Sequence, residues 1–254
     1  MMGHKIIVFD QDGSVDDVIE TTDFYPHSIG LTSNGKYMMY FNVGYKDDET
    51  DSSSSLLLLD NECKEYEKLM PSEGDLHYTV SSHTFFQNNE RLSFIPSFSD
   101  CIFVFKADTV EKIVSFDFGG EILCKEMPEK LQGEDPSFMS DYQGVFGLVS
   151  YQETDSLILL NYIYQQRGRY WLYNKRNGQA VNALKFFEGL NTYSDYYLYG
   201  KQIIAYVSDE DVEGYRKFYD DKEFQKNLKK SPQEIKDLLD GRIKTPAIFY
   251  ITLK

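Results

Sequence analysis

The chain has 254 residues and carries 41 acidic against 26 basic side chains, a net charge of −15 at pH 7. Because nucleic-acid binding draws most of its affinity from lysine and arginine at phosphates, we expect neither a nucleic acid nor an anionic membrane surface as a partner. The sequence has no apolar run near the roughly 20 residues that cross a bilayer, so no membrane-spanning segment is predicted.

A strand–turn–strand pattern occurs four times along the chain. Each copy has an apolar strand, a short polar turn and a second strand, and the copies cover residues 5–19, 55–69, 101–114 and 169–181. The last apolar residues before the turns, at positions 9, 59, 105 and 173, lie 50, 46 and 68 residues apart. Repeats of about 40–50 residues are typical of propeller blades. The sequence therefore predicts an all-β chain, a β-propeller of four-stranded antiparallel blades.

The first copy has no strands before it, so we interpret it as the outer half of a blade. Its turn at Asp10–Gly13, followed by Asp16 and Asp17, resembles a calcium loop at first sight. An EF-hand needs glycine at the sixth position and glutamate at the twelfth, whereas this glycine is fourth. We predict a hairpin turn. In the next unit, Asn34-Gly35 between apolar runs predicts a second hairpin, and residues 46–55 read as a solvated acidic loop.

The middle of the chain contains two further units. Strands are predicted over residues 79–87, 91–96, 101–106 and 111–118, followed by a loop insertion at 121–141 with room for one helical turn. The next unit covers about 145–184, and its continuous apolar run at 157–164 predicts a strand that is buried on both faces.

The last unit has strands predicted at residues 193–199 and 202–207, then a helical insertion at about 212–241. One amphipathic helix is indicated by Tyr215 and Leu228, with Phe218 and Tyr219. A second is predicted to start at Ser231 as the cap, with a capping box to Glu234, and to stop at Gly241. A terminal strand follows at 246–253, which could pair with the N-terminal hairpin. We expect about five blades in one domain, residues 1–254.

Several segments together resemble a known family. They are His4–Gly13 with Tyr25–Ile29, Ile113–Gly119, Asn174–Gly178, and the ending Thr245–Lys254 after a helical segment. On these residues the chain resembles the bacterial six-bladed β-propeller proteins of unknown function, which are NHL-like. Members typically begin with a lipoprotein-type signal and further blades. The resemblance therefore implies six blades and, if the N-terminal part is missing here, a periplasmic or cell-surface lipoprotein; otherwise the chain is expected in the cytoplasm.

Residues that carry chemistry form no recognisable motif. Cys63, Cys101 and Cys124 are an odd set without a C-x-x-C pair, and the four histidines have no metal-ligand spacing, so neither a metal nor a cofactor is predicted. No nucleophile motif predicts a catalytic residue. His27 and His83 lie near the starts of successive first strands, which in propellers run beside the central channel, and they are the candidate binding residues.

The sequence thus favours a non-enzymatic binding or scaffold module over an enzyme. The partner would be a protein, peptide or glycan, recognised at the channel mouth or on a blade face, and the tyrosine-rich stretch 193–199 could supply such a surface. The alternative is a hydrolase or lyase with an axial site of histidines and carboxylates. A cluster of His27, His83 and two carboxylates at one channel mouth would favour the enzyme.

Overall fold

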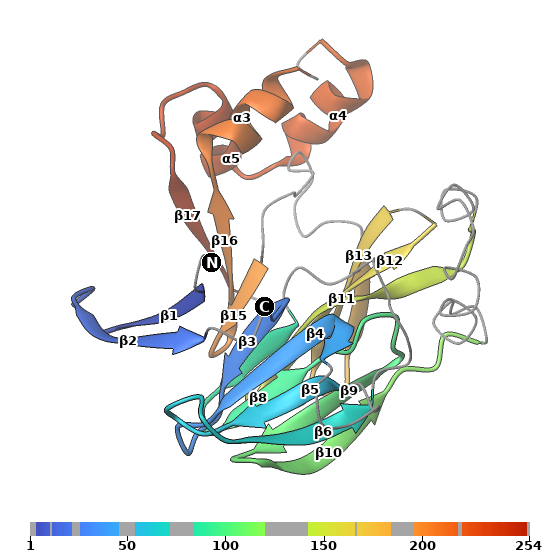
Figure 1. Cartoon of the computed structure of the whole chain (residues 1–254). Coiled ribbons are helices and arrows are strands. Elements are labelled where there is room, and N and C mark those ends of the chain that lie inside the picture. Colours follow the sequence, from blue (N-terminus) through green and yellow to red (C-terminus); the bar gives the residue numbers. More distant parts are fainter. Residues whose placement is uncertain are drawn as a thin grey trace. The chain divides into compact units, whose positions relative to one another are not determined.

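The computed structural model describes residues 4–10, 12–21, 26–45, 54–71, 84–119, 142–165, 167–183, 196–217 and 220–252. Of the predicted loop at 46–55, residues 46–53 lie outside the described residues, as does the whole of the predicted insertion at 121–141. The last two residues of the first loop, Ser54 and Ser55, belong to a strand instead, so the prediction was wrong there. The chain divides into two compact units, Met1–Tyr151 with Tyr162–Gln166, and Gln152–Asn161 with Arg167–Lys254. Both units contain antiparallel strands, and the helices α3 (Asp209–Arg216), α4 (Lys222–Lys230) and α5 (Gln233–Leu239) lie near the C-terminal end (Figure 1).

The described strands form five antiparallel sheets. The first is a hairpin of β1 (His4–Phe9) and β2 (Val15–Thr21). The next two contain β3 (Ser28–Leu31), β4 (Tyr37–Tyr45), β5 (Ser54–Leu59) and β6 (Tyr66–Pro71), then β7 (Phe85–Asn88), β8 (Arg91–Phe94), β9 (Cys101–Lys106) and β10 (Thr109–Ser115). The last two contain β11 (Val145–Glu153), β12 (Leu157–Tyr164), β13 (Arg167–Asn174) and β14 (Ala180–Ala183), then β15 (Tyr196–Tyr199), β16 (Gln202–Val207) and β17 (Ala247–Thr252).

Sheets β3–β6, β7–β10 and β11–β14 each have four strands, which pair in chain order. This confirms the predicted four-stranded antiparallel blades. The four sequence repeats are the hairpins β1–β2, β5–β6, β9–β10 and β13–β14, and in each four-stranded sheet the repeat supplies the third and fourth strands. The interpretation of the first copy as the outer half of a blade stays a prediction, because β1 and β2 pair only with each other among the described strands.

The two turns that the sequence singled out are hairpin turns. In the turn after β3, the backbone N–H of Gly35 donates to the carbonyl of Thr32 (3.0 Å), and Gly35 has a φ of +81°, which glycine adopts without strain. In the β1–β2 turn, the backbone N–H and the hydroxyl of Ser14 donate to the Asp12 carboxylate at 2.9 and 2.7 Å. These bonds lower the pKa of Asp12, which is a turn residue in this structure.

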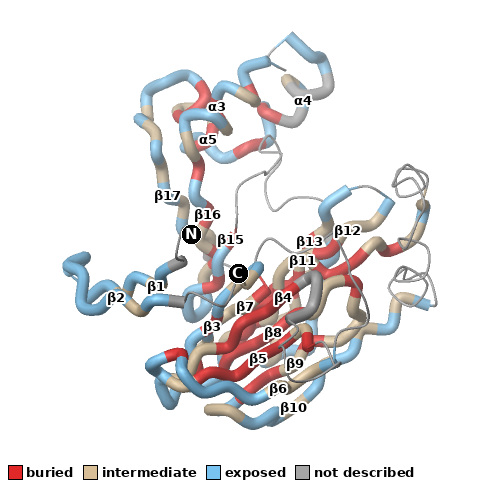
Figure 2. The backbone as a smooth tube through the Cα atoms, viewed as in Figure 1, coloured by how far each residue is buried: buried red, intermediate tan, exposed pale blue. Residues whose placement is uncertain are grey.

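Sheet β3–β6 is covered on both faces. On one face Met38 and Leu56 pack against side chains of the next sheet, including Phe94, and on the other Met39 and Leu57 pack against Ile6 and Ile19 of the β1–β2 hairpin. Figure 2 shows the buried backbone concentrated in strands β4, β5 and β8. Sheet β3–β6 therefore forms core with both of these neighbours, as expected for blades.

The second unit has two apolar clusters. The inward face of sheet β15–β17, with Tyr196, Leu198 and Ile203, packs against Leu159 and Tyr170 from β12 and β13. A second cluster joins the end of that sheet to the helices α3 (Asp209–Arg216), α4 (Lys222–Lys230) and α5 (Gln233–Leu239). Within the part of the chain that the structure describes, none of the helices is long and apolar enough to span a bilayer.

The helical insertion differs from its prediction in two respects. It contains three helices instead of two, and Phe218 and Tyr219, expected in one continuous helix, lie outside the described residues. Pro232 occupies the N-cap position of α5, without a side-chain cap bond, and the backbone N–H of Ser231 donates to the carbonyl of Leu228 in α4. The prediction of Ser231 as the N-cap residue was wrong, because α5 begins one residue later than predicted. The predicted stop at Gly241 is confirmed by its φ of +76°.

The two chain ends pair with different strands. Strand β17 pairs with β16, β1 pairs with β2, and the expected pairing of the terminal strand with the N-terminal hairpin is not among the strand pairs of the described residues. The organisation of residues 1–254 as one domain stays a prediction.

Candidate functional site

Of the two candidate histidines, the structure describes only His27. His27 is exposed immediately before β3; its backbone N–H donates to the carbonyl of Tyr40 (2.7 Å), and its imidazole lies edge-on to the Tyr40 ring, with centroids 6.1 Å apart. His83 lies outside the described residues. Among the described residues, no three His, Cys, Asp or Glu side chains are grouped to hold a metal ion. The axial site at His27 and His83 stays a prediction.

The tyrosine-rich stretch divides between the two faces of a sheet. In β15 the side chains alternate, so Tyr196 and Leu198 are buried whereas Tyr197 and Tyr199 point outward, and Tyr199 is 70% exposed. Residues 193–195 lie outside the described residues. Strand packing therefore explains Tyr196 and Leu198, whereas Tyr197 and Tyr199 form part of a surface.

Sheet β15–β17 extends this outward surface across three strands. Tyr197 lies opposite Ile204, which lies opposite Tyr250, and Tyr206 lies opposite Ile248 in the next row. Tyr250 is 62% exposed. The three strands contain no charged residue. We call this set the tyrosine face: Tyr197, Tyr199, Ile204, Tyr206, Ile248 and Tyr250.

A buried glutamine fixes the free edge of β15. The Gln152 side chain, from the end of β11, donates through Nε2 to the carbonyl of Tyr196 (2.6 Å) and accepts through Oε1 from the N–H of Leu198 (2.6 Å). Because β15 pairs with β16 on its other side, this amide takes the place of a neighbouring strand. The backbone that carries Tyr197 and Tyr199 is therefore held on both edges.

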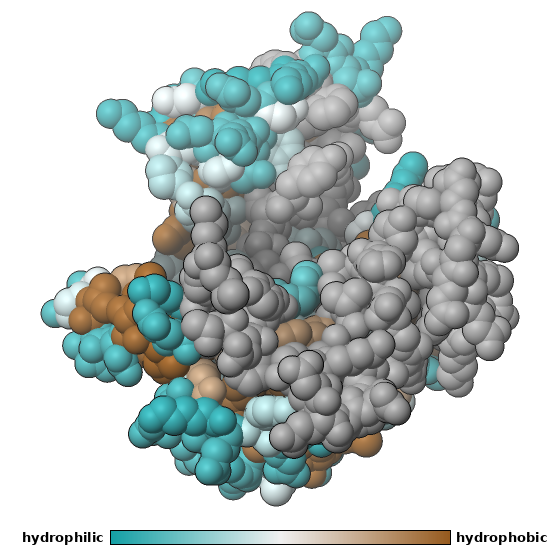
Figure 3. Space-filling view, in the orientation of Figure 1, coloured by the Kyte–Doolittle hydropathy of each residue, from teal (hydrophilic) through white to brown (hydrophobic). Residues whose placement is uncertain are grey.

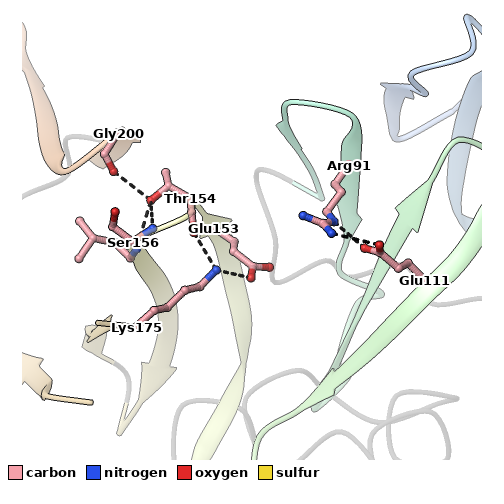
Figure 4. A network of polar contacts seen from close by, with 8 residues as sticks. Arg91, Glu111, Glu153, Thr154, Ser156, Lys175 and Gly200 are labelled. Carbon is pink, nitrogen blue, oxygen red and sulfur yellow. Dashed lines mark hydrogen bonds and ion pairs between the residues drawn. The ribbon is translucent and has the colours of Figure 1, made fainter. Parts of the chain in front are cut away.

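A second set of polar contacts joins Glu153, Thr154, Lys175 and Gly200 (Figure 4). The Lys175 ammonium lies 2.5 Å from the Glu153 carboxylate and donates to the carbonyl of Thr154 (2.7 Å). The Thr154 hydroxyl in turn donates to the carbonyl of Gly200 (2.9 Å), in the β15–β16 turn. Tyr199 precedes that turn directly, so the network positions the most exposed tyrosine of the face.

Two other surfaces of the described residues are less suited to a partner than the tyrosine face. A cleft of about 520 Å³ between α3 and α5 is lined by charges of both signs, but Asp209 accepts from Thr245 and Arg216 donates to the carbonyl of Leu239, so these groups hold the helices together. The β1–β2 hairpin exposes Ile7 opposite Val18, and Figure 3 shows hydrophobic colour gathered over it. That patch is aliphatic in its centre and offers few hydrogen-bonding groups.

The comparisons with known proteins agree with this architecture. A family model described as a 6-bladed beta-propeller matches residues 1–211. The chain belongs to this family. The matched range includes the sheets up to β16 and ends inside α3, so β17 follows it. The NHL-like part of the resemblance stays a prediction.

Solved structures show the same fold. The chain is similar to a crystal structure described as a "Putative exported protein" from Bacteroides fragilis, with a TM-score of 0.72 and 14% sequence identity, over 98% of this chain and 72% of that chain. At this identity the likeness establishes the fold alone. None of the curated proteins matches the chain.

Sequence reasoning found part of the tyrosine face and missed the rest. The alternation in residues 202–207 and 247–252 marks Tyr206, Ile248 and Tyr250 as facing one way, so their share of the surface could have been predicted. Ile248 and Tyr250 share a surface with Tyr197 only because β17 pairs with β16, and the helical insertion separates these two strands in the sequence. No pattern in the sequence predicts that the Gln152 amide bonds the backbone of β15.

Proposed function

We propose that this propeller is a non-enzymatic binding module that takes up a polypeptide partner on the tyrosine face. The observation that carries the proposal is the face itself: an uncharged surface of four tyrosines and two isoleucines on three paired strands. Tyrosine combines a large apolar ring with a hydroxyl and has few side-chain torsions to immobilise, which is why it is enriched in protein-binding surfaces.

The support around the face favours the same role. Its inward side is packed on β12 and β13, its β15 edge is held by Gln152, and its end is closed by the helices. A rigid surface loses little conformational entropy when it binds, so more of the contact energy appears as affinity.

A polypeptide suits this face better than a glycan. A sugar ring carries hydroxyl groups that lose water on binding and need polar partners in return. Apart from tyrosine hydroxyls, the outward side chains that the structure describes are Ile204 and Ile248, which offer only apolar contact, and Gln202, beside Tyr199. Apolar and aromatic side chains of a peptide match this composition.

The test is a selection of displayed peptides on the purified chain. A phage library of random twelve-residue peptides is selected on the unaltered protein and counter-selected on the variant Tyr197→Ser/Tyr199→Ser/Tyr250→Ser. We expect a set of peptides, enriched in aromatic and β-branched residues, that binds the unaltered chain and not the variant. Selected peptides that bind both proteins equally, or a selection that yields no binder, would contradict the proposal.

Two controls make the selection decisive. The variant Tyr66→Ser changes an exposed tyrosine of β6 and should retain the peptides. Thermal unfolding of the triple variant should stay close to that of the unaltered chain, since Tyr199 and Tyr250 are largely exposed and Tyr197 is 40% exposed. A glycan array probed in parallel should remain negative, and binding there instead of in the peptide selection would replace the polypeptide with a sugar.

A further inference from the structure

The charge of the chain is divided unequally between its two compact units. The unit Met1–Tyr151 with Tyr162–Gln166 contains 27 acidic and 10 basic residues, a net charge of −17. The unit Gln152–Asn161 with Arg167–Lys254 contains 14 acidic and 16 basic residues, a net charge of +2. Helix α4 carries this positive excess, because its nine residues, KEFQKNLKK, include four lysines and one glutamate. Helix α4 is therefore a positively charged element in an acidic chain.

The four lysines lie on one side of α4. At 3.6 residues per turn, their positions fall within an arc of about 100° around the helix axis. All four residues are exposed. Leu228 points to the opposite side of the helix, where it is buried in the cluster that joins the three helices. We call this set the lysine face: Lys222, Lys226, Lys229 and Lys230.

The ammonium groups of the lysine face are not engaged within the chain. Among the described residues, none of the four has an ion-pair or hydrogen-bond partner, although the sequence contains 41 acidic residues. Lysines elsewhere behave differently: Lys36, Lys64 and Lys175 lie 2.8, 2.5 and 2.5 Å from a carboxylate oxygen. The positive charge of the lysine face is therefore available to a partner.

The stability of α4 does not account for all of this charge. Lys229 and Lys230 lie in the last turn, where positive charge complements the helix dipole. Lys222 begins the helix, where positive charge opposes that dipole. Lys226 lies four residues from both Lys222 and Lys230, and like charges at this spacing destabilise a helix. The dipole thus explains two of the four lysines, whereas an anionic partner would neutralise all four.

We propose that the lysine face binds an acidic segment of a partner polypeptide, as a second surface besides the tyrosine face. Nine helical residues extend about 14 Å, which about four or five residues of an extended chain also span. The segment that fits therefore carries several aspartate or glutamate residues within that length. Charge complementarity of this kind speeds association and selects the partner.

A short acidic segment suits the lysine face better than other anionic partners. A nucleic acid or an anionic membrane is an extended array of negative charge, which a chain of net charge −15 repels as a whole. Two copies of the chain repel each other for the same reason. A segment of a few residues engages the lysines of α4 alone, because salt screens charges beyond about 8 Å at physiological ionic strength.

The test uses a fluorescein-labelled peptide of ten alternating aspartate and glutamate residues, titrated with the full chain and followed by fluorescence anisotropy. We expect binding that is lost between about 0.1 and about 1 M sodium chloride, as the Debye length falls from about 10 to about 3 Å. The variant Lys222→Gln/Lys226→Gln/Lys229→Gln/Lys230→Gln should weaken the peptide by about tenfold or more, since four ion pairs are lost. Its melting temperature should not fall, because glutamine has nearly the helix propensity of lysine.

A matched variant separates the lysine face from the net charge. It removes four exposed lysines from other elements, as Lys5→Gln/Lys64→Gln/Lys106→Gln/Lys201→Gln, and should change the Kd by no more than about twofold. Equal weakening in both variants would overturn the proposal, because the peptide would then respond to total charge. The absence of binding to the unaltered chain at about 0.1 M salt would also overturn it.

Three further probes test the choice of partner. A ten-nucleotide single strand, or vesicles containing phosphatidylserine, that bound the lysine face more tightly than the peptide would overturn the assignment to a polypeptide. So would a dimer of the chain alone that the variant of the lysine face abolishes, since a second copy would then be the occupant. The variant Tyr197→Ser/Tyr199→Ser/Tyr250→Ser should bind the acidic peptide as the unaltered chain does, so a failure of the tyrosine face leaves this inference standing.

Discussion

Sheets β3–β6 and β15–β17 are built from similar apolar strands but are covered differently. All four leucines of β5, Leu56–Leu59, are buried, because a sheet packs on either side of them. In β16, Ile203, Ala205 and Val207 are buried, whereas Tyr206 on the other side is exposed. The alternation of a strand fixes which residues share a face, and the neighbours decide whether that face becomes core or surface.

The largest difference in the free energy of unfolding is expected between truncation of a side chain buried between two sheets and truncation of one on the exposed face of β17. Leu57→Ala should lower the free energy of unfolding by about 2–5 kcal/mol, because it leaves a cavity in a closed core. Ile248→Ala should change it by only about 0.5 kcal/mol, since that side chain is mostly solvated. Urea unfolding of both variants measures this. Equal losses would mean that β17 is covered in solution.

A smaller effect is expected at the capped edge of sheet β15–β17. Gln152→Met should cost about 2 kcal/mol, because the carbonyl of Tyr196 and the N–H of Leu198 lose their partner. Gln233→Met, on the exposed surface of α5, is the matched control and should be neutral. Urea unfolding and exchange of the Leu198 amide report the loss, and an unaffected amide would show that the cap is dispensable.

Helix α3, at the end of this sheet, begins with a capping box formed by Ser208 and Asp211. Ser208 accepts from the N–H of Asp211 and the Asp211 carboxylate accepts from the N–H of Ser208, at 3.2 and 2.8 Å. Ser208→Ala should cost about 1 kcal/mol in thermal unfolding. Ser33→Ala, at an exposed turn serine, is the control. A loss at Ser208 no larger than at Ser33 would argue against the box.

The smallest effect is expected where ion pairing joins sheets β3–β6 and β7–β10. Lys36 donates to Asp108 at 2.8 Å, and this bond holds the pKa of Asp108 below its ordinary value. A carboxyl with a lowered pKa in the folded state contributes stability above its unfolded pKa, and loses it as the pH falls through the folded one. The melting temperature of Asp108→Asn should therefore lie slightly below that of the unaltered chain at pH 7 and match it at pH 2, and a gap that persists at pH 2 would contradict this account.

Much of the fold could be predicted because turns and apolar runs are local signals. The predicted ranges 101–106, 157–164 and 202–207 coincide with β9, β12 and β16, since each is a continuous apolar run between turn residues. Ser231 was predicted as the cap because serine is a favoured N-cap residue, whereas α5 has Pro232 at that position.

The candidate site was less predictable because it depends on pairings far apart in the chain. The helical insertion separates β16 from β17, so the partnership of Tyr250 with Ile204 is not a local signal. Gln152 likewise acts on a strand more than 40 residues away. The alternation of each strand predicted which residues share a face. It did not predict which of the two faces another sheet covers.

The account depends most directly on whether the tyrosine face binds a polypeptide. Isothermal titration of one selected peptide into the unaltered chain and into Tyr199→Ser/Tyr250→Ser tests this. We predict a Kd at least tenfold weaker for the variant, a loss of about 1.4 kcal/mol, with an unchanged melting temperature. An unchanged Kd would contradict the assignment of the tyrosine face as the binding surface.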